Sequence, residues 1–280
     1  MIVYFNGNYL PLDDVKISPY DRGFQFADGV YETLRTYNGK LFRFDSHLKR
    51  LKYSLNELNI NFEQFNEIEK ISYELAEINN LHKKEFSTYI QITRGVQFPR
   101  KHNFENHLSP SVFVSVSELI DNRQQVEKGV KVILEKDIRW LRCDIKSISI
   151  LPSVLAKTKA VSFNAYETVF YRDNFITEGS HTNFFAVRND IIYTAPVSNF
   201  ILEGVTREVV IELCFLNNLK VVEDYIKVDE LKTFNEFFIT GTTTEVTPVI
   251  QLNDRIVGDG IPGKVTKLIQ NIFYEYVKSV

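Results

Sequence analysis

One lysine of this chain lies in a setting that could support attack on a carbonyl group. Lys146 falls within Cys143-Asp144-Ile145-Lys146-Ser147-Ile148-Ser149-Ile150, where apolar and polar residues alternate as in a strand. A lysine that apolar neighbours shield from water is available as a free amine, the form that attacks carbonyl carbon. Taken alone, however, the pattern favours a lysine that faces solvent from an amphipathic strand and pairs with Asp144.

Two glycine-containing segments have the form of an anion site. Gly204-Val205-Thr206-Arg207 places a glycine turn and a capping Thr206 ahead of a predicted helix, which leaves backbone N–H groups free to bind a phosphate. Thr240-Gly241-Thr242-Thr243-Thr244-Glu245 repeats this pattern, with Thr242 and Glu245 spaced as a capping box. Each segment alone is more typical of an ordinary helix start.

A carboxylate and a basic loop are two further candidates. Glu178 ends a predicted strand at a glycine turn, in Ile176-Thr177-Glu178-Gly179-Ser180. It could hold the proton of a pyridinium ring, or it could be an ordinary turn residue. Pro99-Arg100-Lys101-His102 lies in a loop over residues 95–110, and its composition alone favours a solvated basic loop.

Composition and charge exclude several classes of protein. The 280 residues include 33 Lys+Arg and 36 Asp+Glu, so the chain lacks the basic excess that nucleic-acid binding requires. The 5 histidines and the 2 cysteines, Cys143 and Cys214, show no metal-ligand spacing, and motifs for phosphate loops, dinucleotides and serine hydrolysis are absent. Two cysteines form no disulfide framework, and no apolar run reaches the roughly 18–20 residues of a membrane helix. We therefore expect a cytoplasmic protein without metal, membrane or nucleic-acid partners.

The elements that must position these candidates mix strands and helices irregularly. Alternation predicts a strand over residues 29–37 with Tyr31, Thr33 and Arg35 on one face, and Glu32 on the other. Other strands are expected at 3–5, 9–10, 88–93, 111–116, 130–134, 146–150, 168–171, 183–187, 191–194, 236–240 and 249–252, and helices at 46–58, 62–79, 155–163, 206–216 and 264–277. Ser46 is expected to cap the first helix.

This irregular order favours an α+β architecture over a doubly wound sheet, because strands and helices do not alternate one by one. The polar stretch 121–127 is the best candidate boundary. It would separate a smaller N-terminal α+β domain, 1–120, from a larger C-terminal domain, 121–280.

Six segments together resemble a known family, the fold type IV pyridoxal-phosphate transaminases. In the family's order they are Asp21-Arg22-Gly23 with Asp28-Gly29-Val30-Tyr31-Glu32, His47-Leu48-Lys49-Arg50-Leu51, the Lys146 segment, Thr177-Glu178-Gly179-Ser180 with Asn183, Gly204-Val205-Thr206-Arg207 and Thr240-Gly241-Thr242-Thr243-Thr244-Glu245. They span nearly the whole chain. The resemblance implies a two-domain α+β enzyme with a cleft for pyridoxal 5'-phosphate between the domains.

The resemblance also implies roles for individual residues. Lys146 would hold the cofactor as an internal aldimine and then shuttle a proton at the substrate Cα. Glu178 would keep the pyridine nitrogen protonated. Glu167 would lie near the lysine amine, and these three residues would be the catalytic ones. The other cofactor contacts would come from Arg50, Val205, Thr206, Gly241 and Thr242 at the phosphate and from Leu202 on the ring face away from Lys146.

Within the family, two segments are most similar to the D-amino acid transaminases. One is the run over residues 137–147, and the other is Pro99-Arg100-Lys101-His102, which matches an Arg-x-His carboxylate trap. By this resemblance Tyr31, with Arg100 and His102 from a second subunit, would anchor the α-carboxylate. A loop that completes its neighbour's active site implies a homodimer.

The strand face that carries Tyr31 also predicts which residues line the pocket for the substrate side chain. Thr33 and Arg35 share the face of Tyr31 and would line the pocket together with Tyr89. Arg35 could then favour acidic substrates such as D-glutamate. The resulting hypothesis is an enzyme that moves an amino group between a D-amino acid, such as D-alanine or D-glutamate, and a 2-oxo acid by ping-pong chemistry.

Two departures from the D-specific pattern leave alternatives open. Gly241 stands where D-specific members often have a hydroxyl residue, which favours an L-branched-chain transaminase, and His181-Thr182 replaces a small hydroxyl pair. An aminodeoxychorismate lyase would use the same Lys146, but the trap motif argues against it. A cofactor-binding protein without activity is disfavoured because Lys146, Glu178 and Arg50 occur together.

Overall fold

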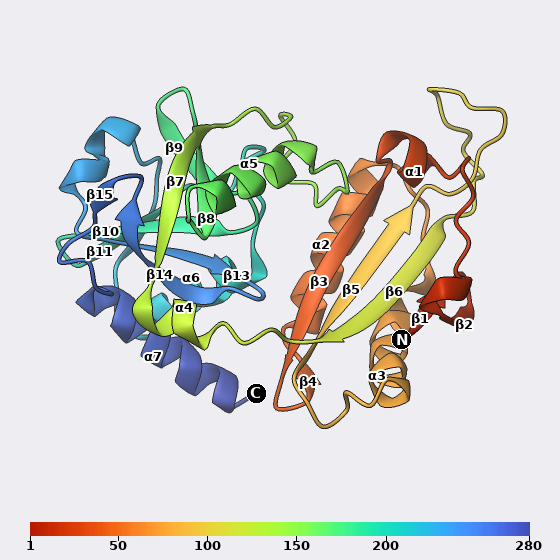
Figure 1. The fold of residues 1–280 in the computed structure, drawn as a ribbon, viewed down its shortest axis with the longest axis horizontal. Helices are drawn as coiled ribbons and strands as arrows, with labels where there is room; N and C mark the ends of the chain where they lie inside the picture. Colours follow the sequence, from red (N-terminus) through yellow and green to blue (C-terminus); the bar gives the residue numbers. More distant parts are fainter. The chain divides into compact units, whose positions relative to one another are not determined.

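The computed structural model describes residues 1–280, which form two compact units (Figure 1). Unit 1 comprises Met1–Ile120, Ile145–Ser149 and Val280, and unit 2 comprises Asp121–Asp144 and Ile150–Ser279. The sequence places all of 121–280 in one domain, whereas the segment Ile145–Ser149 packs with unit 1. Backbone hydrogen bonds from Tyr31 N to the Lys146 carbonyl and from Ile148 N to the Gly29 carbonyl hold it there.

Unit 1 is built on a six-stranded sheet with the order β2-β1-β6-β5-β3-β4, in which all paired strands are antiparallel. Its elements are β1 (Ile2–Phe5), β2 (Asn8–Pro11), the 3-10 helix η1 (Leu12–Asp14), α1 (Arg22–Phe26), β3 (Gly29–Tyr37), β4 (Lys40–Leu41), α2 (Phe44–Glu57), the 3-10 helix η2 (Gln64–Glu67), α3 (Ile68–Ile78), β5 (Phe86–Thr93) and β6 (Ser111–Glu118). The alternation over residues 29–37 predicts β3 correctly, and the side chains at even positions from 30 to 36 are buried.

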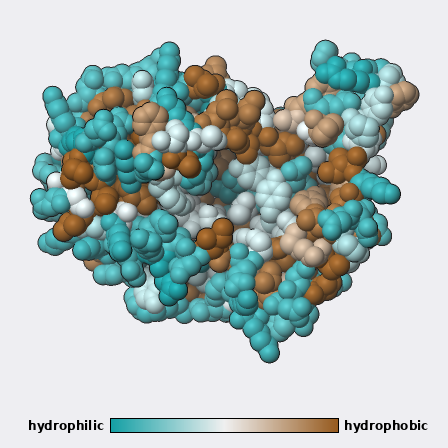
Figure 2. Space-filling view, viewed as in Figure 1, coloured by the Kyte–Doolittle hydropathy of each residue, from teal (hydrophilic) through white to brown (hydrophobic).

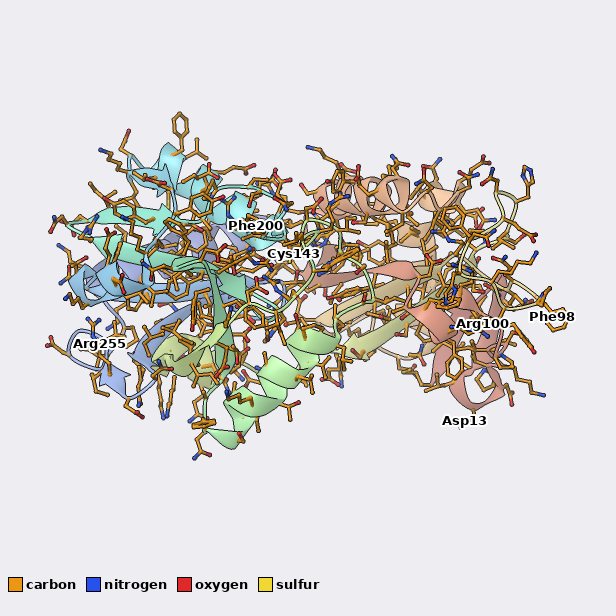
Figure 3. The ribbon with its side chains drawn as sticks, turned by 90° about the horizontal axis from the view of Figure 1, so that it is seen from above. Asp13, Phe98, Arg100, Cys143, Phe200 and Arg255 are labelled. Carbon is orange, nitrogen blue, oxygen red and sulfur yellow. The ribbon has the colours of Figure 1, made fainter.

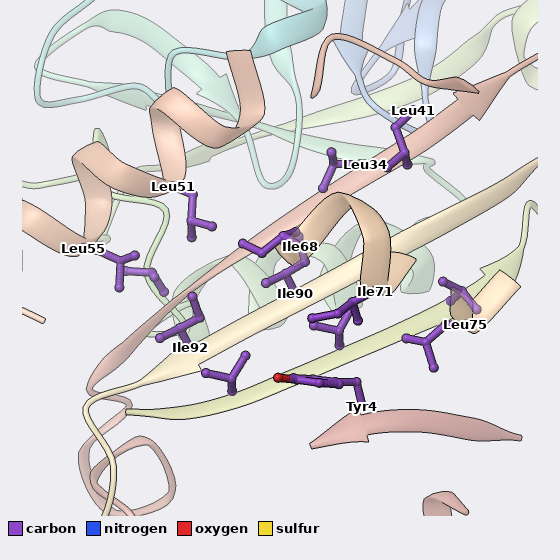
Figure 4. Close-up of a cluster of buried hydrophobic side chains, with 14 of the residues drawn as sticks. Tyr4, Leu34, Leu41, Leu51, Leu55, Ile68, Ile71, Leu75, Ile90 and Ile92 are labelled. Carbon is purple, nitrogen blue, oxygen red and sulfur yellow. The ribbon is translucent and has the colours of Figure 1, made fainter. Parts of the chain in front are cut away.

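The core of unit 1 lies between this sheet and the helices α2 and α3 (Figure 4). Leu51 and Leu55 of α2 are one helical turn apart, so both side chains reach the same sheet face. Leu75 of α3 and Ile90 of β5 are buried in the same cluster. Burying each such side chain contributes about 1.5–3 kcal/mol, which fixes α2, the helix that carries Arg50.

Unit 2 is built on a nine-stranded mixed sheet with the order β12-β11-β10-β13-β14-β7-β8-β9, and β15 pairs with β14. Its elements are α4 (Arg123–Lys128), β7 (Val130–Lys136), α5 (Leu151–Ser162), β8 (Glu167–Arg172), β9 (Phe175–Gly179), β10 (Asn183–Arg188), β11 (Ile191–Thr194), α6 (Val205–Leu216), β12 (Val221–Glu223), the 3-10 helix η3 (Val228–Thr233), β13 (Glu236–Gly241), β14 (Glu245–Leu252), β15 (Arg255–Ile256) and α7 (Lys264–Lys278). The α+β prediction is confirmed.

Phenylalanines fill both faces of the central strands in unit 2. Phe185 of β10 and Phe238 of β13 are directly opposite each other, and their rings stack with centroids 4.6 Å apart. Phe184 and Phe237 meet on the other face, with centroids 5.3 Å apart. Burial on both faces explains the continuous apolar runs in these strands, and it accounts for part of the chain's 22 Phe.

Several local predictions are wrong. The helix α2 begins at Phe44 after Arg43 in the left-handed region, so Ser46 lies inside the helix and does not cap it. The single helix expected over 62–79 is divided into η2 and α3. Residues 146–150 form no strand, since Ser147 makes only an isolated bridge to Val30. No helix in the structure combines the length and apolar character that a membrane crossing requires.

Candidate active site

Lys146 is held in unit 1 by its own main chain. Its N–H donates to Ser54 Oγ of α2 at 3.1 Å, and its carbonyl accepts from the N–H of Tyr31 on β3 at 3.0 Å. The ammonium lies 4.3 Å from the centroid of the Tyr31 ring. The segment is therefore a turn clamped between a helix and a strand, and this clamp fixes where the amine can reach.

Arg50 lies in the same unit in a buried charge cluster. Its Nε and Nη2 donate to the two oxygens of Glu32, at 2.7 and 2.9 Å, and His47 Nδ1 lies 2.8 Å from Glu32 Oε2. Burial raises the pKa of Glu32, but Arg50 and His47 outweigh it and hold that pKa well below its usual range. Burial also lowers the pKa of His47. The sequence analysis missed both partners of Arg50, although the alternation places the acidic Glu32 on the buried strand face.

The residues predicted for substrate binding form two groups in unit 1. On the half-buried face of the sheet, Thr33 of β3 is opposite Tyr89 of β5, and the rings of Tyr31 and Tyr89 have centroids 5.8 Å apart. Burial raises the pKa of Tyr89 to about 12, and its hydroxyl donates to Gln91 Oε1 at 2.7 Å. Arg35 lies further along the strand, with its guanidinium 4.1 Å from the Tyr37 ring centroid.

The second group is the loop that follows β5. Arg100 and His102 are both exposed, and both face the ring of Phe26. The Arg100 guanidinium carbon is 4.3 Å from the Phe26 centroid, and the His102 and Phe26 centroids are 5.7 Å apart. Figure 3 shows Phe98 projecting outward from this loop, with Arg100 lying inward of it. The two residues of the trap motif thus lie together.

Glu178 is the centre of a buried network in unit 2. Its carboxylate accepts hydrogen bonds from Arg139 Nη1 at 2.6 Å, from the Leu202 N–H at 2.9 Å and from Asn183 Nδ2 at 3.1 Å. Burial raises the pKa of Glu178, and the Arg139 guanidinium and the Leu202 N–H oppose that rise. Arg139, which also pairs with Asp137, was missed as a site residue because a buried arginine has no periodic signature in the sequence.

The two candidate anion segments meet at the first residue of β10. Asn183 pairs with Thr240 at the end of β13, and its Nδ2 donates to the Leu202 carbonyl just before α6. A Cβ on Gly204 would lie 2.0 Å from Asn183 Oδ1, so only glycine fits there. These contacts place the first turn of α6 beside the end of β13, whose last residue is Gly241.

Neither segment is capped in the way that the sequence predicts. Gly204 is the N-cap of α6 and Thr206 lies inside the helix, with no side chain capping the first turn. Gly241 is the last residue of β13, and Thr242 begins the turn that joins β13 to β14, so no helix follows and no capping box forms. The uncapped N–H groups of α6 and the buried Thr240 hydroxyl, which has no hydrogen-bond partner, fit a phosphate group.

Glu167 is fully buried in unit 2, and its charge is balanced there. His181 Nδ1 lies 2.7 Å from Glu167 Oε2, Ser180 Oγ donates to Oε1 at 2.5 Å, and Thr182 Oγ1 donates to Oε2 at 3.1 Å. Burial raises the pKa of Glu167, but His181 and Ser180 bring it to about 2. The sequence analysis noted His181 only as a departure from the family pattern and did not assign it to Glu167.

Comparison with known proteins identifies the family. Residues 29–252 match the family model described as amino-transferase class IV. The chain is 40% identical to a D-alanine aminotransferase of Bacillus licheniformis over 100% of this chain and 98% of the relative, and 38% identical to one of Staphylococcus aureus strain COL over 99% and 98%. The chain belongs to the class IV aminotransferases.

Solved structures agree with this assignment. A T.th. branched-chain amino acid aminotransferase complexed with N-(5'-phosphopyridoxyl)-L-glutamate matches with a TM-score of 0.88 and 27% identity over 99% of this chain and 94% of that chain. A branched-chain amino acid aminotransferase of Escherichia coli matches in fold, with a TM-score of 0.90 and 23% identity over 98% and 93%. The protein is an aminotransferase that depends on pyridoxal 5'-phosphate, and the uncapped start of α6 and the unpartnered Thr240 hydroxyl in unit 2 fit the phosphate group of that cofactor.

Proposed function

We propose that this protein is a D-amino acid transaminase, which moves an amino group between a D-amino acid, such as D-alanine or D-glutamate, and a 2-oxo acid by ping-pong chemistry. The observation that carries this proposal is the identity of 40% with a D-alanine aminotransferase over essentially the full length of both chains. The likeness to the branched-chain enzyme of Escherichia coli, at 23% identity, concerns the fold alone. The Arg100-x-His102 motif supports the same substrate class.

In this proposal Lys146 moves the proton. When bound, pyridoxal phosphate supplies an electron sink for the electron pair that remains after the substrate Cα loses its proton. The Nζ of Lys146 takes that proton, and the clamp formed by Ser54 and Tyr31 sets the side from which it approaches. Since Lys146 removes only a proton that points toward it, the anchor of the substrate carboxylate decides which enantiomer reacts.

Several residues of the chain would hold the cofactor. Glu178 would accept the N–H of the pyridine ring, with its carboxylate oriented by Arg139, Leu202 and Asn183. The phosphate would be bound by Arg50, Val205, Thr206, Gly241 and Thr242, and Leu202 would contact the ring. Glu167 would act near the lysine amine as a fixed negative charge, because its low pKa keeps it ionised.

The substrate carboxylate would be bound by Tyr31 together with Arg100 and His102 of a second subunit, which makes the enzyme a homodimer. Two donors and a phenol match the planar geometry of a carboxylate. Thr33, Arg35 and Tyr89 would line the side-chain pocket. Self-association is also supported by an apolar patch over α5 in Figure 2, and the exposed apolar side chains of this helix are Leu151, Val154, Leu155 and Val161.

We further propose a cytoplasmic location. Both Cys143 and Cys214 are free thiols buried in unit 2, and burial raises the pKa of each thiol to about 12. Thiols of this kind are typical of proteins in reducing compartments.

The function is tested by steady-state turnover of D-alanine with 2-oxoglutarate, measured as pyruvate formed. The wild-type protein is expected to turn over, and Lys146→Ala is expected to lose at least about a thousandfold in rate, the upper part of the range for a proton-transfer group. Lys49→Ala, which changes an exposed lysine of α2, is the matched control and should keep the wild-type rate. Normal turnover by Lys146→Ala would overturn the proposed role of this lysine.

One observation favours a second candidate, an L-branched-chain transaminase. A Cβ at Gly241 would meet no atom closer than 3.5 Å, so the site has room for the hydroxyl residue that D-specific members often carry, yet the residue is glycine. This candidate predicts faster turnover with L-leucine than with D-alanine. Turnover of D-alanine is measured as pyruvate formed, and turnover of L-leucine is measured as glutamate formed, both with 2-oxoglutarate as the acceptor. Comparing the two rates distinguishes the two candidate functions.

A further inference from the structure

We propose that Arg22 is a positioning residue that holds Arg100 and His102 in place for the substrate carboxylate. The inference rests on the proposed function, in which these two residues bind that carboxylate. It adds Arg22, which does not itself bind the carboxylate, and Phe26, whose ring supports the side chains of Arg100 and His102. All the contacts that carry the inference lie within unit 1.

Arg22 binds the backbone of the trap motif directly. Its Nη1 donates to the carbonyl of Lys101 at 2.7 Å, and its Nη2 donates to the carbonyl of His102 at 3.0 Å. Two consecutive peptide groups of the exposed segment are therefore tied to a side chain that is only 5% exposed. The backbone of a loop segment anchored in this way cannot reorient without breaking two charge-assisted hydrogen bonds.

The guanidinium of Arg22 is itself fixed by two further acceptors. Its Nε donates to Asp28 Oδ2 at 2.8 Å, and Nη1 also contacts Gln97 Oε1 at 3.2 Å. Gln97 in turn donates to the carbonyl of Asn103 at 3.2 Å. Burial raises the pKa of Asp28, but Arg94 and Arg22 outweigh it and lower that pKa. The anchor is thus a charged, buried network that spans both ends of the trap motif.

Phe26 completes the arrangement by supporting the side chains. Its ring centroid is 4.8 Å from the Arg22 guanidinium carbon and 4.3 Å from that of Arg100, and the His102 ring lies beside it. Arg22 and Phe26 are the first and last residues of α1, which Asp21 caps through the N–H of Gly23 at 2.8 Å. One short helix therefore fixes the backbone of the motif and the direction of its guanidinium.

Such preorganisation acts on binding, because a loop that is already ordered loses less conformational entropy when the ligand arrives. Lysine cannot replace Arg22 in this role. It has no planar fork of donors, so it cannot reach Asp28, Gln97 and the two carbonyls at once.

The experiment compares Arg22→Lys with Arg94→Lys in the purified, cofactor-loaded enzyme. Arg94 is the matched control, since it is 6% exposed and also pairs with Asp28, but its other hydrogen bonds go to the carbonyls of Leu58 and Asn59 after α2. Its guanidinium also lies 3.6 Å from the Phe104 ring centroid, where a lysine keeps the positive charge. Arg22→Lys is expected to raise the KM for D-alanine about tenfold, the effect of one lost charge-assisted hydrogen bond, with a much smaller change in kcat. Arg94→Lys should leave the KM close to that of wild type at a similar loss of thermal stability.

Two further measurements separate positioning from a general structural effect. Amide hydrogen exchange should accelerate at residues 101–103 in Arg22→Lys and not in Arg94→Lys. Phe26→Leu, at a half-buried site, keeps the Arg22 network and should raise the KM about threefold, the effect of a lost cation–π contact. If Arg22→Lys does not fold, the Phe26 variant alone decides, and an unchanged KM in it would overturn the inference.

The same assay with Arg100→Ala separates this inference from the proposed function. If Arg100→Ala raises the KM and Arg22→Lys does not, the positioning role of Arg22 is wrong and the proposed trap stands. If Arg100→Ala leaves the KM unchanged, the trap itself is wrong, whatever Arg22→Lys does. Equal KM increases in Arg22→Lys and Arg94→Lys would assign Arg22 a structural role only.

Discussion

Three buried carboxylates each have a basic side chain at short distance. Glu32 lies 2.7 Å from Arg50, Glu167 lies 2.7 Å from His181, and Glu178 lies 2.6 Å from Arg139. Arg50 and Arg139 are largely shielded from solvent, and removing one partner of such a buried pair costs about 3–5 kcal/mol, because a buried charge is left without compensation. His181 is 39% exposed, so its removal should cost less. Each pair therefore fixes the direction of both side chains before any ligand binds.

The first residue-scale prediction concerns the orientation of Arg50. Glu32→Gln removes the charge that holds this guanidinium, so affinity for pyridoxal phosphate is expected to fall by roughly tenfold, the effect of one charge-assisted hydrogen bond. Affinity is measured by titrating apoprotein with the cofactor and following its absorbance. Glu69→Gln, at an exposed position of α3, serves as the control. An unchanged affinity in Glu32→Gln would show that Arg50 does not depend on Glu32.

The second residue-scale prediction concerns stability in acid. The pKa of Glu167 is about 2 in the folded protein and about 4.3 in an unfolded chain. A depressed carboxyl pKa stabilises the fold above about pH 4.3, and the contribution is lost as the pH falls toward 2. His181→Ala removes the partner that lowers this pKa, so unfolding in acid should begin at a higher pH.

The control for His181 is another pair of the same residue types. His82 lies 3.2 Å from Glu77 and is about as exposed as His181, but Glu77 is exposed whereas Glu167 is buried. Exposed pairs contribute about 0–1 kcal/mol. His181→Ala is expected to lower the free energy of unfolding at pH 7 by about 1–3 kcal/mol, the cost of a buried acceptor that loses its donor. Equal shifts in the two variants, measured by denaturant unfolding, would contradict the role assigned to His181.

At the scale of elements, the spacing of apolar residues in α3 leads to a further prediction. Leu75 is fully buried, whereas Ile78 on the same helix is 48% exposed. Leu75→Ala is expected to destabilise the protein by about 2–5 kcal/mol through the cavity it leaves, and Ile78→Ala by less than about 1 kcal/mol. Thermal unfolding of the two variants checks this, and similar losses would place the core of unit 1 elsewhere.

Elements could be predicted from the sequence where a strand or helix has one apolar face, as β3 and α7 show. The segment Ile145–Ser149 also alternates, but its backbone groups bond to β3 and to Ser54, so it is held as a turn. Thr242 and Glu245 likewise have the spacing of a capping box. Strand β13 pairs with β14 up to the Gly241–Glu245 pair, however, so the residues between them form a hairpin turn. Contacts with distant parts of the chain decided the first case, and pairing between two neighbouring strands decided the second. Residue spacing within the segment reports neither.

The candidate site, like the elements, could be predicted from the sequence only in part. Lys146 and Glu178 are candidates from their own sequence settings, and the resemblance adds Arg50 and gives all three their proposed roles, because they lie in short motifs that keep their order along the chain. Their partners Arg139 and Glu32 were not found as partners, since each pair joins residues 18 to 39 positions apart. A buried carboxylate requires a cation, but the sequence does not say which one.

At the scale of the whole molecule, the proposed dimer makes a prediction that mixing tests. If Arg100 serves the neighbouring subunit, a heterodimer of Lys146→Ala and Arg100→Ala subunits contains one intact site. Random reassociation of equal amounts should then restore about a quarter of the wild-type activity, since half of the dimers are heterodimers with one working site each. Activity no higher than that of the separate variants would place Arg100 in the site of its own subunit.

The central claim, a D-specific class IV aminotransferase, is tested most directly by a single half-reaction without an oxo-acid acceptor. The cofactor-loaded protein is mixed with D-alanine or with L-leucine, and the absorbance of the bound pyridoxal phosphate is followed. We expect D-alanine to convert this band to that of the pyridoxamine form and L-leucine to leave it unchanged. Conversion by L-leucine alone would contradict the account.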